Sequence, residues 1–249
     1  MSNTLKTILN TAIATLIFAY VFVMLVAVAD GNDEIVCNRL EITMADSATV
    51  QLVSSVDIAH KLQALNLNPV GKTYKYIETE AIENTLRQNP MIKKAECFKT
   101  PSGVVRVRIV QREPKFRVIT SGESYYVDKE KKTMPTSPNY AAYVPVVSGA
   151  VTRTQAVGEL FDFITFLEKK PFWNAQIEQI YVTSNKEIEL VPRIGEGIIL
   201  LGSLENYEQK LGKLYKLYTK AFNEIGGWNS YKTIDLRYKD QVVCTRRQL

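Results

Sequence analysis

The sequence predicts an α+β protein that begins with a single N-terminal transmembrane helix, continues into a small β-α-α-β-β domain and ends in a mixed α+β domain dominated by a β-sheet. Three observations lead to this fold class. An uncharged stretch near the N-terminus is long enough to cross a bilayer. Strand and helix patterns follow in the order β-α-α-β-β within residues 35–110. Beyond them, alternating strand patterns are interleaved with amphipathic helix patterns.

Residues 8–29 carry no charged side chain, and as a helix they would extend roughly 33 Å, enough to cross a membrane. The only charged side chain before them is Lys6, whereas acidic residues follow from Asp30 onward. This asymmetry favours an N-terminus inside the cell. We therefore expect a short cytoplasmic tail at 1–7, a transmembrane helix at 8–29 and export of the remaining residues.

A cleaved signal peptide is the alternative interpretation of the same segment. Residues 27–29 read Ala-Val-Ala, which is an A-x-A cleavage pattern, and cleavage after Ala29 would release a secreted binding protein. The apolar core of a signal peptide usually spans about 7–15 residues, and this uncharged run is longer. Its length favours an anchor that stays uncleaved.

The cysteines give a weak signal for disulfides. Only Cys37, Cys97 and Cys244 are present, and their spacing matches no metal site. An exported domain permits a Cys37–Cys97 bridge, because both residues lie at predicted strands. We favour three free thiols and leave the bridge open.

The first exported domain is expected over residues 35–112. A short strand opens it, two helices follow, and a hairpin of two strands closes it. Pro90 ends the second helix, because the residue before a proline avoids the α region. The expected elements are a strand at 35–44, helices at 54–65 and 79–88, and strands at 92–98 and 104–110 around a turn at 100–103. One sheet covered on one face by two helices forms a complete small domain.

The second exported domain is expected over residues 113–249. It contains two amphipathic helices, of which the first stops before Pro171 and the second ends at Gly226-Gly227. The expected elements are a helix at 152–170, a strand pair within 176–192, a strand at 197–202, a helix at 203–227 and a last strand at 234–238. We expect nothing beyond this last strand that could pair with its outer edge. Such an edge is either guarded by its charged side chains or used to bind a partner by strand addition.

Residues suited to catalysis are scarce. His60 is the only histidine, and it lies on the solvent-facing side of its predicted helix. Gly197 and Gly202 have the spacing of a phosphate-binding loop, but Ser203-Leu204 follow where that motif needs Lys and Ser or Thr. The net charge of +5 is dispersed, which disfavours a nucleic-acid partner. We therefore expect no catalytic residue, cofactor, metal ion or small-molecule substrate.

Four segments together resemble the FtsQ/DivIB family of bacterial cell-division proteins, and the β-α-α-β-β order is similar to a POTRA module. The first combines Pro90, Ile92 and Lys93 with the run Gln111-Arg112-Glu113-Pro114. The others are "ESYYVDKEKKTMP" at 123–135, "YVPVVSG" at 143–149 and "IDLRYKDQVV" at 234–243. Three features depart from the family. The first strand of members commonly ends in a glycine before the first helix, whereas here residues 43–53, "TMADSATVQLV", intervene. The N-terminal tail is short, and no aromatic residue follows Arg237-Tyr238 where some members have one.

The resemblance implies a non-enzymatic, single-pass type II scaffold of the division complex. It would lie in the bacterial inner membrane at the division site, with its C-terminal domains in the periplasm, and would link early to late division proteins. Implied partners are similar to FtsB and FtsL, with FtsK-, FtsW- and FtsI-like proteins as further candidates. The alternative is a POTRA-containing outer-membrane assembly or secretion factor, although such proteins usually carry several repeats or a barrel.

The expected partner-binding segment is the C-terminal strand together with the residues immediately after it. Arg237 and Tyr238 match the motif of the resembled family. Lys239, Asp240, Gln241, Val242 and Val243 are added because of their expected place at the sheet edge.

Overall fold

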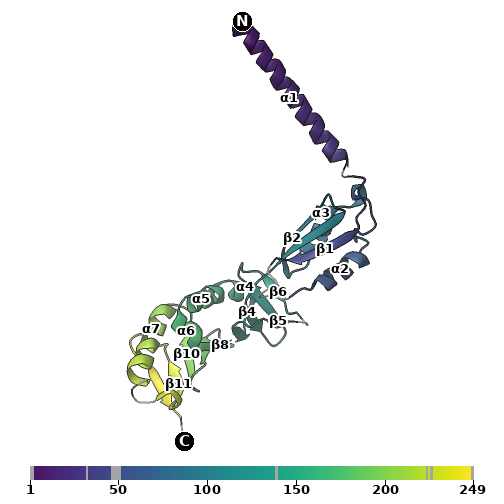
Figure 1. The fold of residues 1–249 in the computed structure, drawn as a ribbon. Coiled ribbons are helices and arrows are strands. Elements are labelled where there is room, and N and C mark those ends of the chain that lie inside the picture. Colours follow the sequence, from purple (N-terminus) through teal and green to yellow (C-terminus); the bar gives the residue numbers. More distant parts are fainter. Residues whose placement is uncertain are drawn as a thin grey trace. The chain divides into compact units, whose positions relative to one another are not determined.

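The structure is a computed structural model that describes residues 3–31, 33–45, 52–137, 140–222, 224 and 227–247. The chain divides into two compact units, Met1–Gln111 and Arg112–Leu249. Figure 1 shows the elements of both units along the chain.

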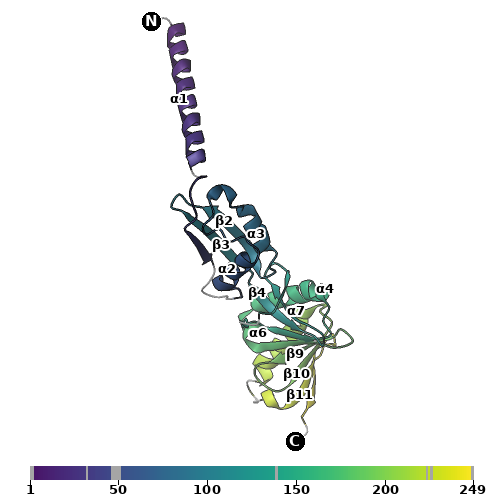
Figure 2. The ribbon, with the colours of Figure 1, turned by 90° about the vertical axis from the view of Figure 1, so that its right-hand side faces the viewer.

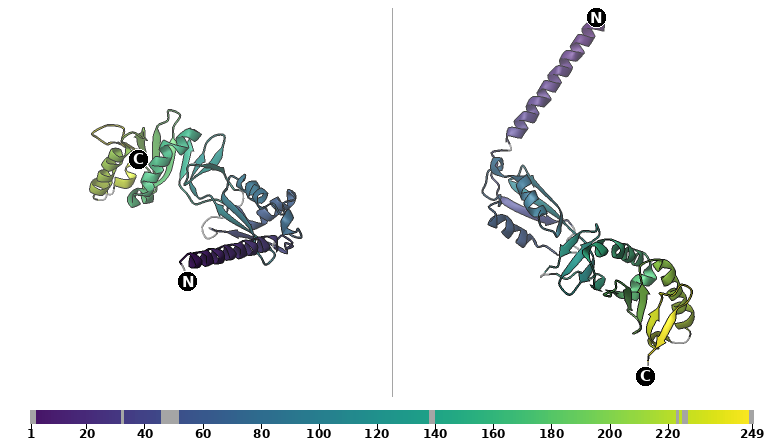
Figure 3. Two further views of the ribbon diagram at one scale, coloured as in Figure 1. Left: turned by 90° about the horizontal axis from the view of Figure 1, so that it is seen from above. Right: turned by 180° about the vertical axis from the view of Figure 1, so that it is seen from behind.

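An uninterrupted helix, α1 (Asn3–Gly31), contains the uncharged stretch (Figure 3). Large apolar side chains within it are exposed: Ile13, Leu16, Ile17, Phe18, Tyr20, Val21, Phe22, Val23 and Met24. In the part of the chain that the structure describes, no helix meets the length and apolarity that a membrane span requires. The predicted membrane span at 8–29 is therefore not confirmed.

After α1, the described part of the first unit contains a three-stranded sheet and two α-helices, as expected. Its elements are β1 (Arg39–Met44), α2 (Ser55–Ala64), the 3₁₀ turn η1 (Tyr74–Tyr76), α3 (Thr79–Arg87), β2 (Ile92–Lys99) and β3 (Val104–Gln111). The strand order is β1-β3-β2, with β1 parallel and β2 antiparallel to β3. The predicted β-α-α-β-β order is confirmed.

Local sequence signals explain these elements. Ser54 caps α2, because its Oγ accepts the N–H of Asp57 at 3.1 Å. The helices bury Ile58, Leu62, Ile82 and Leu86, and the central strand buries Val105, Val107 and Ile109. His60 is exposed on α2, as the helical periodicity predicts. Cys37, Cys97 and Cys244 are all free thiols.

The second unit is built on a nine-stranded sheet. Its strands are β4 (Pro114–Ile119), β5 (Ser124–Asp128), β6 (Thr133–Pro135), β7 (Val146–Gly149), β8 (Ile177–Val182), β9 (Ile188–Pro192), β10 (Ile198–Gly202), β11 (Tyr231–Asp235) and β12 (Val243–Arg246). The spatial order is β12-β11-β10-β9-β8-β7-β4-β5-β6. Three pairs are parallel, namely β4–β7, β7–β8 and β10–β11.

Helices cover one face of this sheet. They are α4 (Arg153–Val157), α5 (Glu159–Glu168), α6 (Pro171–Gln176) and α7 (Tyr207–Leu217), and Figure 2 shows strands β9, β10 and β11 side by side. Across the covered face, Ile180, Leu190, Ile199 and Ile234 occupy one row of the register. They join the apolar residues of α5 and α7 in one buried core.

The prediction of a single helix over 152–170 is wrong, because this segment forms two helices, α4 and α5. Gly158 has φ −99° and ψ −113°, outside the helical region, and separates α4 from α5. A third helix, α6, begins at Pro171, where proline supplies the fixed φ suited to a first helical turn. The apolar spacing runs through Gly158, so periodicity alone did not show that break, whereas the predicted stop before Pro171 is confirmed.

The helix predicted over 203–227 is shorter than expected. It begins at Tyr207, because Asn206 takes a left-handed conformation with φ 53°. It passes at Tyr218 into a π-helical turn, η2 (Tyr218–Phe222). A 3₁₀ turn, η3 (Gly227–Asn229), then precedes β11. The predicted stop at Gly226 lies outside the described residues.

Candidate partner-binding edge

The C-terminal segment forms a hairpin rather than one free strand. β11 ends at Asp235, and β12 then pairs with it antiparallel, with Asp235 opposite Val243 and Ile234 opposite Cys244. The strand predicted at 234–238 is therefore misplaced, because β11 begins and ends three residues earlier. The expectation that nothing pairs beyond it is also wrong, because β12 covers the outer edge of β11.

Two residues explain why β11 stops at Asp235. The N–H of Leu236 still donates to the carbonyl of Leu200 at 2.9 Å, and its side chain is fully buried. The Asp235 Oδ1 accepts the backbone N–H of Arg237 at 3.0 Å. A side-chain acceptor for the N–H two residues on is the geometry of an Asx turn, which ends extended pairing.

The guanidinium of Arg237 binds groups of its own unit. Its Nη2 donates to Asp235 Oδ2 at 2.7 Å, and its Nη1 donates to Glu187 Oε2 at 3.2 Å. The hydrogen bonds from Arg237 lower the pKa of the Asp235 carboxyl, and Asp235 in turn raises the pKa of Arg237. Gly202 makes room for this side chain, because a Cβ there would lie 2.7 Å from the Arg237 Cγ.

A lysine of α7 holds the loop between the two strands. The Lys213 Nζ donates to the carbonyl of Tyr238, to that of Lys239 at 3.1 Å and to that of Gln241 at 3.4 Å. One ammonium group has three donors, so it can serve three carbonyls at once. The shape of the loop therefore depends on a residue from another element.

A polar hollow of about 290 Å³ lies between this loop and the start of α7. Its lining includes Lys210, Lys213, Arg237 and Lys239, with Glu205 as an acidic member. The Lys210 Nζ donates to the carbonyl of Ser203 at 2.8 Å, and burial lowers the pKa of Lys210. The hollow is cationic on balance.

The structure brings the predicted site residues together in three different settings. Arg237, Lys239, Asp240 and Gln241 are exposed in the loop, and Tyr238 beside them is 49% exposed. Val242 is half-buried against the core. Val243 is the first residue of β12 and is 40% exposed.

Sequence reasoning missed the strand beyond Val243 and the residues that support the loop. Thr245 and Arg246 belong to β12, and Lys213 and Glu187 lie far away along the chain. The β-branched residues around Cys244 are typical of a strand and could have indicated β12. No local pattern relates Lys213 to the loop, because that contact depends on the fold.

The outer side of β12 is the edge of the nine-stranded sheet. Among the described residues, no strand pairs with β12 on the side away from β11. After β12, the N–H of Arg247 donates to the carbonyl of Ser230 at 3.0 Å, and its guanidinium pairs with Glu196. These contacts fix the end of β12 to the sheet and leave its outer backbone groups facing outward.

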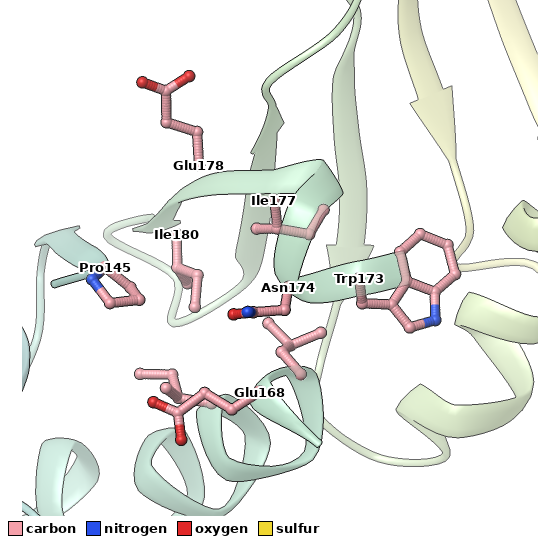
Figure 4. Close-up of a pocket in the computed structure, with 9 residues that line it drawn as sticks. Pro145, Glu168, Trp173, Asn174, Ile177, Glu178 and Ile180 are labelled. Carbon is pink, nitrogen blue, oxygen red and sulfur yellow. The ribbon is translucent and has the colours of Figure 1, made fainter. Parts of the chain in front are cut away.

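A second cavity in this unit is too small for a ligand (Figure 4). It lies between α5, α6 and β8 and has a volume of about 20 Å³, with Ile164, Leu167 and Trp173 among its lining residues. This volume holds about one water molecule. Within the described residues, no three His, Cys, Asp or Glu side chains gather as a metal site would require.

Family comparisons cover both units. A model described as "FtsQ/DivIB, C-terminal related" matches residues 113–245, which is more than half of the chain. A model of a POTRA-like domain matches residues 35–110. No curated protein matches the chain. Since the first match covers more than half of the chain and extends from before β4 into β12, the chain belongs to the FtsQ/DivIB family.

Proposed function

We propose that the protein is a membrane-anchored scaffold of the bacterial division complex that binds an extracytoplasmic segment of a partner division protein along β12. The family connects the chain with cell division. FtsQ/DivIB proteins and POTRA domains are typically non-enzymatic scaffolds, which supports a binding role over a catalytic one.

The outer edge of β12 is the observation that carries the proposal. An edge strand presents a row of backbone N–H and C=O groups that an extended peptide can pair with. β12 has only four residues, Val243 to Arg246, so backbone pairing alone supplies few hydrogen bonds. Exposed side chains of the preceding loop, above all Tyr238, would supply the remaining contact area.

In this proposal the partner pairs with β12, whereas pairing with the preceding strand was expected from the sequence. Arg237 has a supporting role in this arrangement, because its guanidinium is bound to Asp235 and Glu187. Tyr238 and Val243 remain available for contact. The partners are FtsB- and FtsL-like membrane proteins, with FtsK-, FtsW- and FtsI-like proteins as further candidates.

Photo-cross-linking in dividing cells tests the proposal. A photoreactive residue at Val243 or Thr245 is expected to capture a division protein, which mass spectrometry of the adduct identifies. Tyr238→Ala is expected to lower capture about tenfold, as loss of one well-placed aromatic contact does. Tyr143→Ala is the matched control, because Tyr143 is a 94% exposed tyrosine of the same unit. Equal capture by both variants would falsify the assigned surface.

Anchoring by residues 8–29 belongs to the same proposal. It is supported by the absence of charge in this stretch and by the exposed apolar side chains of α1. After an alkaline wash of membranes, we expect the chain to remain in the pellet with residues 1–29 intact. A mature N-terminus at Asp30 would instead support the secreted binding protein.

A further inference from the structure

Four backbone hydrogen bonds bind residues 33–37 to the loop that ends in η1. The N–H of Lys75 donates to the carbonyl of Asp33 at 3.2 Å, and the N–H of Tyr74 donates to that of Ile35 at 2.9 Å. Val36 forms an antiparallel bridge with Thr73. The N–H of Cys37 donates to Lys72 O at 2.9 Å, and the N–H of Gly71 donates to Cys37 O at 2.8 Å. The loop at 65–76 is therefore held against residues 33–37.

This loop lies within a short chain length of the end of α1. The helix ends at Gly31, and Asp33 follows two residues later. Two residues span at most about 7 Å, whatever direction the chain takes between them. Lys75 is hydrogen-bonded to Asp33, so the loop cannot lie far from the last turn of the helix.

The loop and the adjoining segment expose apolar side chains that the fold leaves uncovered. Tyr76 is 72% exposed, Leu65 is 52% exposed, and Val36 and Val70 are each 47% exposed. Elsewhere in the first unit Val56 is 61% exposed and Phe98 is 43% exposed, whereas Ile58, Leu62, Ile82 and Leu86 are nearly fully covered. Four of these six exposed side chains thus lie on the loop and the segment that adjoin α1.

Two lysines accompany these apolar side chains. Lys72 and Lys75 are both exposed, and the Lys72 Nζ donates to the carbonyl of Asn66 at 2.7 Å. A tyrosine ring among aliphatic side chains, with lysines beside it, is the composition that lies at the boundary between lipid headgroups and acyl chains. Lysine stems cover apolar surface there while their ammonium groups reach phosphate.

We propose that Val36, Leu65, Val70 and Tyr76, with Lys72 and Lys75, form a surface that rests on the outer headgroup layer of the membrane. The inference rests on the proposed anchor, because it is the anchor that brings this end of the unit to the bilayer. The contact sets which end of the first unit faces the lipid. The opposite end, where β2 begins and β3 ends, then points away from the membrane.

A pair of photoreactive positions tests the contact in the full chain. The protein is inserted into vesicles of phosphatidylethanolamine and phosphatidylglycerol, with the photoreactive residue at Tyr76 or at Gln88. Gln88 is the matched control, because it is exposed just before Ile92, which pairs with Gln111. The segment next to the proposed surface lies at the other end of β3, where the N–H of Asn38 donates to the carbonyl of Gly103. The eight residues of β3 separate the two ends by about 25 Å. We expect at least about tenfold more lipid adduct at Tyr76 than at Gln88, since interfacial side chains enter only the outer 5–10 Å of the layer.

The other outcomes overturn the inference in distinguishable ways. Equal lipid adducts at Tyr76 and Gln88 indicate random collisions, and an adduct of Tyr76 with a second copy of the chain indicates a protein interface. An alkaline wash of the same vesicles tests the anchor separately. Loss of the chain in the wash overturns both the anchor and the contact. Retention of the chain without an adduct at Tyr76 overturns the contact alone.

Discussion

Arg237 shows how a residue marked by a family motif can act first on its own fold. Its guanidinium donates to the Asp235 carboxylate at the end of β11 and to Glu187, which lies between β8 and β9. Asp235 is buried, so it depends on this partner and on the Arg237 N–H. The arginine therefore positions the loop that carries Tyr238.

Arg237→Ala is expected to destabilise the second unit by about 1 kcal/mol near neutral pH, because a charge-assisted hydrogen bond to a mostly buried carboxylate is lost from an exposed arginine. Both tryptophans, Trp173 and Trp228, lie in this unit, so their fluorescence during urea unfolding measures it. Arg193→Ala removes another exposed arginine of the unit and should change little.

The deficit of Arg237→Ala should shrink in acid. The folded pKa of Asp235 lies below its ordinary value of 3.8, so the stabilisation is fully present above that pH. It is lost as the pH falls through the lowered pKa and the carboxylate is protonated in the folded state as well. A deficit that stayed constant through this window would show that Asp235 is not the partner that matters.

Two neighbouring tyrosines of β5 should respond oppositely to the same change. The buried Tyr125 hydroxyl has no hydrogen-bond partner in the described part of the chain, and burial raises its pKa. The Tyr126 hydroxyl accepts the N–H of Ala142 at 3.2 Å. Tyr125→Phe should therefore leave stability equal or raise it by up to about 1 kcal/mol, whereas Tyr126→Phe should lower it by about 1 kcal/mol. Urea unfolding followed by tryptophan fluorescence compares them, and an equal loss in both would contradict this account.

At the scale of single elements, periodicity predicted most helices and strands but missed α6, β12 and the break at Gly158. The strand and helix patterns of the first unit located α2, α3, β2 and β3 within a few residues. Gly158 divides a continuous apolar stripe, and a stripe does not show a change of helix axis. The turn after Asp235 depends on a side-chain acceptor and on Leu236 entering the core, which alternation alone cannot reveal.

Lys213 is expected to act on the loop through its three carbonyl contacts. Lys213→Met keeps much of the apolar stem but removes the ammonium, so the loop at 236–242 should loosen. We expect trypsin to cleave after Lys239 several-fold faster and partner capture from Val243 to fall about five- to tenfold, because a looser loop must be ordered on binding.

Lys216→Met is the control for this change. Lys216 is exposed on the same helix, and its replacement removes a trypsin site in the same way. Unchanged cleavage after Lys239 in Lys213→Met would show that the loop is held by other contacts.

At the scale of the whole molecule, the second unit has a core of its own. The buried cluster begins at Phe116 and ends at Leu236, and it includes residues from both halves of the sheet. A fragment that starts at Arg112 should therefore unfold with a free energy within about 1 kcal/mol of the full chain, as independent domains do. Tryptophan fluorescence during urea unfolding measures this. A markedly less stable fragment would show that the first unit contributes to this core.

The order of strands in the second unit was beyond prediction from sequence. Hairpins such as β8–β9 follow from turn residues and neighbouring patterns. The parallel pairs β4–β7 and β10–β11 join segments separated by long connections, and any of several orders would bury the same apolar faces. The resemblance to the FtsQ/DivIB family was visible in the sequence, whereas the position of β12 at the edge of the sheet depends on the three-dimensional strand order.

The parallel pairing of β1 with β3 has a consequence for biosynthesis. Arg39 lies opposite Val104, so the first strand emerges from the ribosome well before β3, its neighbour in the described sheet. Gln111, at the end of that neighbour, accepts the N–H of Val53 and joins the last residue of the unit to the segment just before α2. The unit can therefore close only after the hairpin of β2 and β3 has been synthesised. During that interval the backbone N–H and C=O groups of β1 have no strand to pair with, so a chaperone that binds extended segments can engage them.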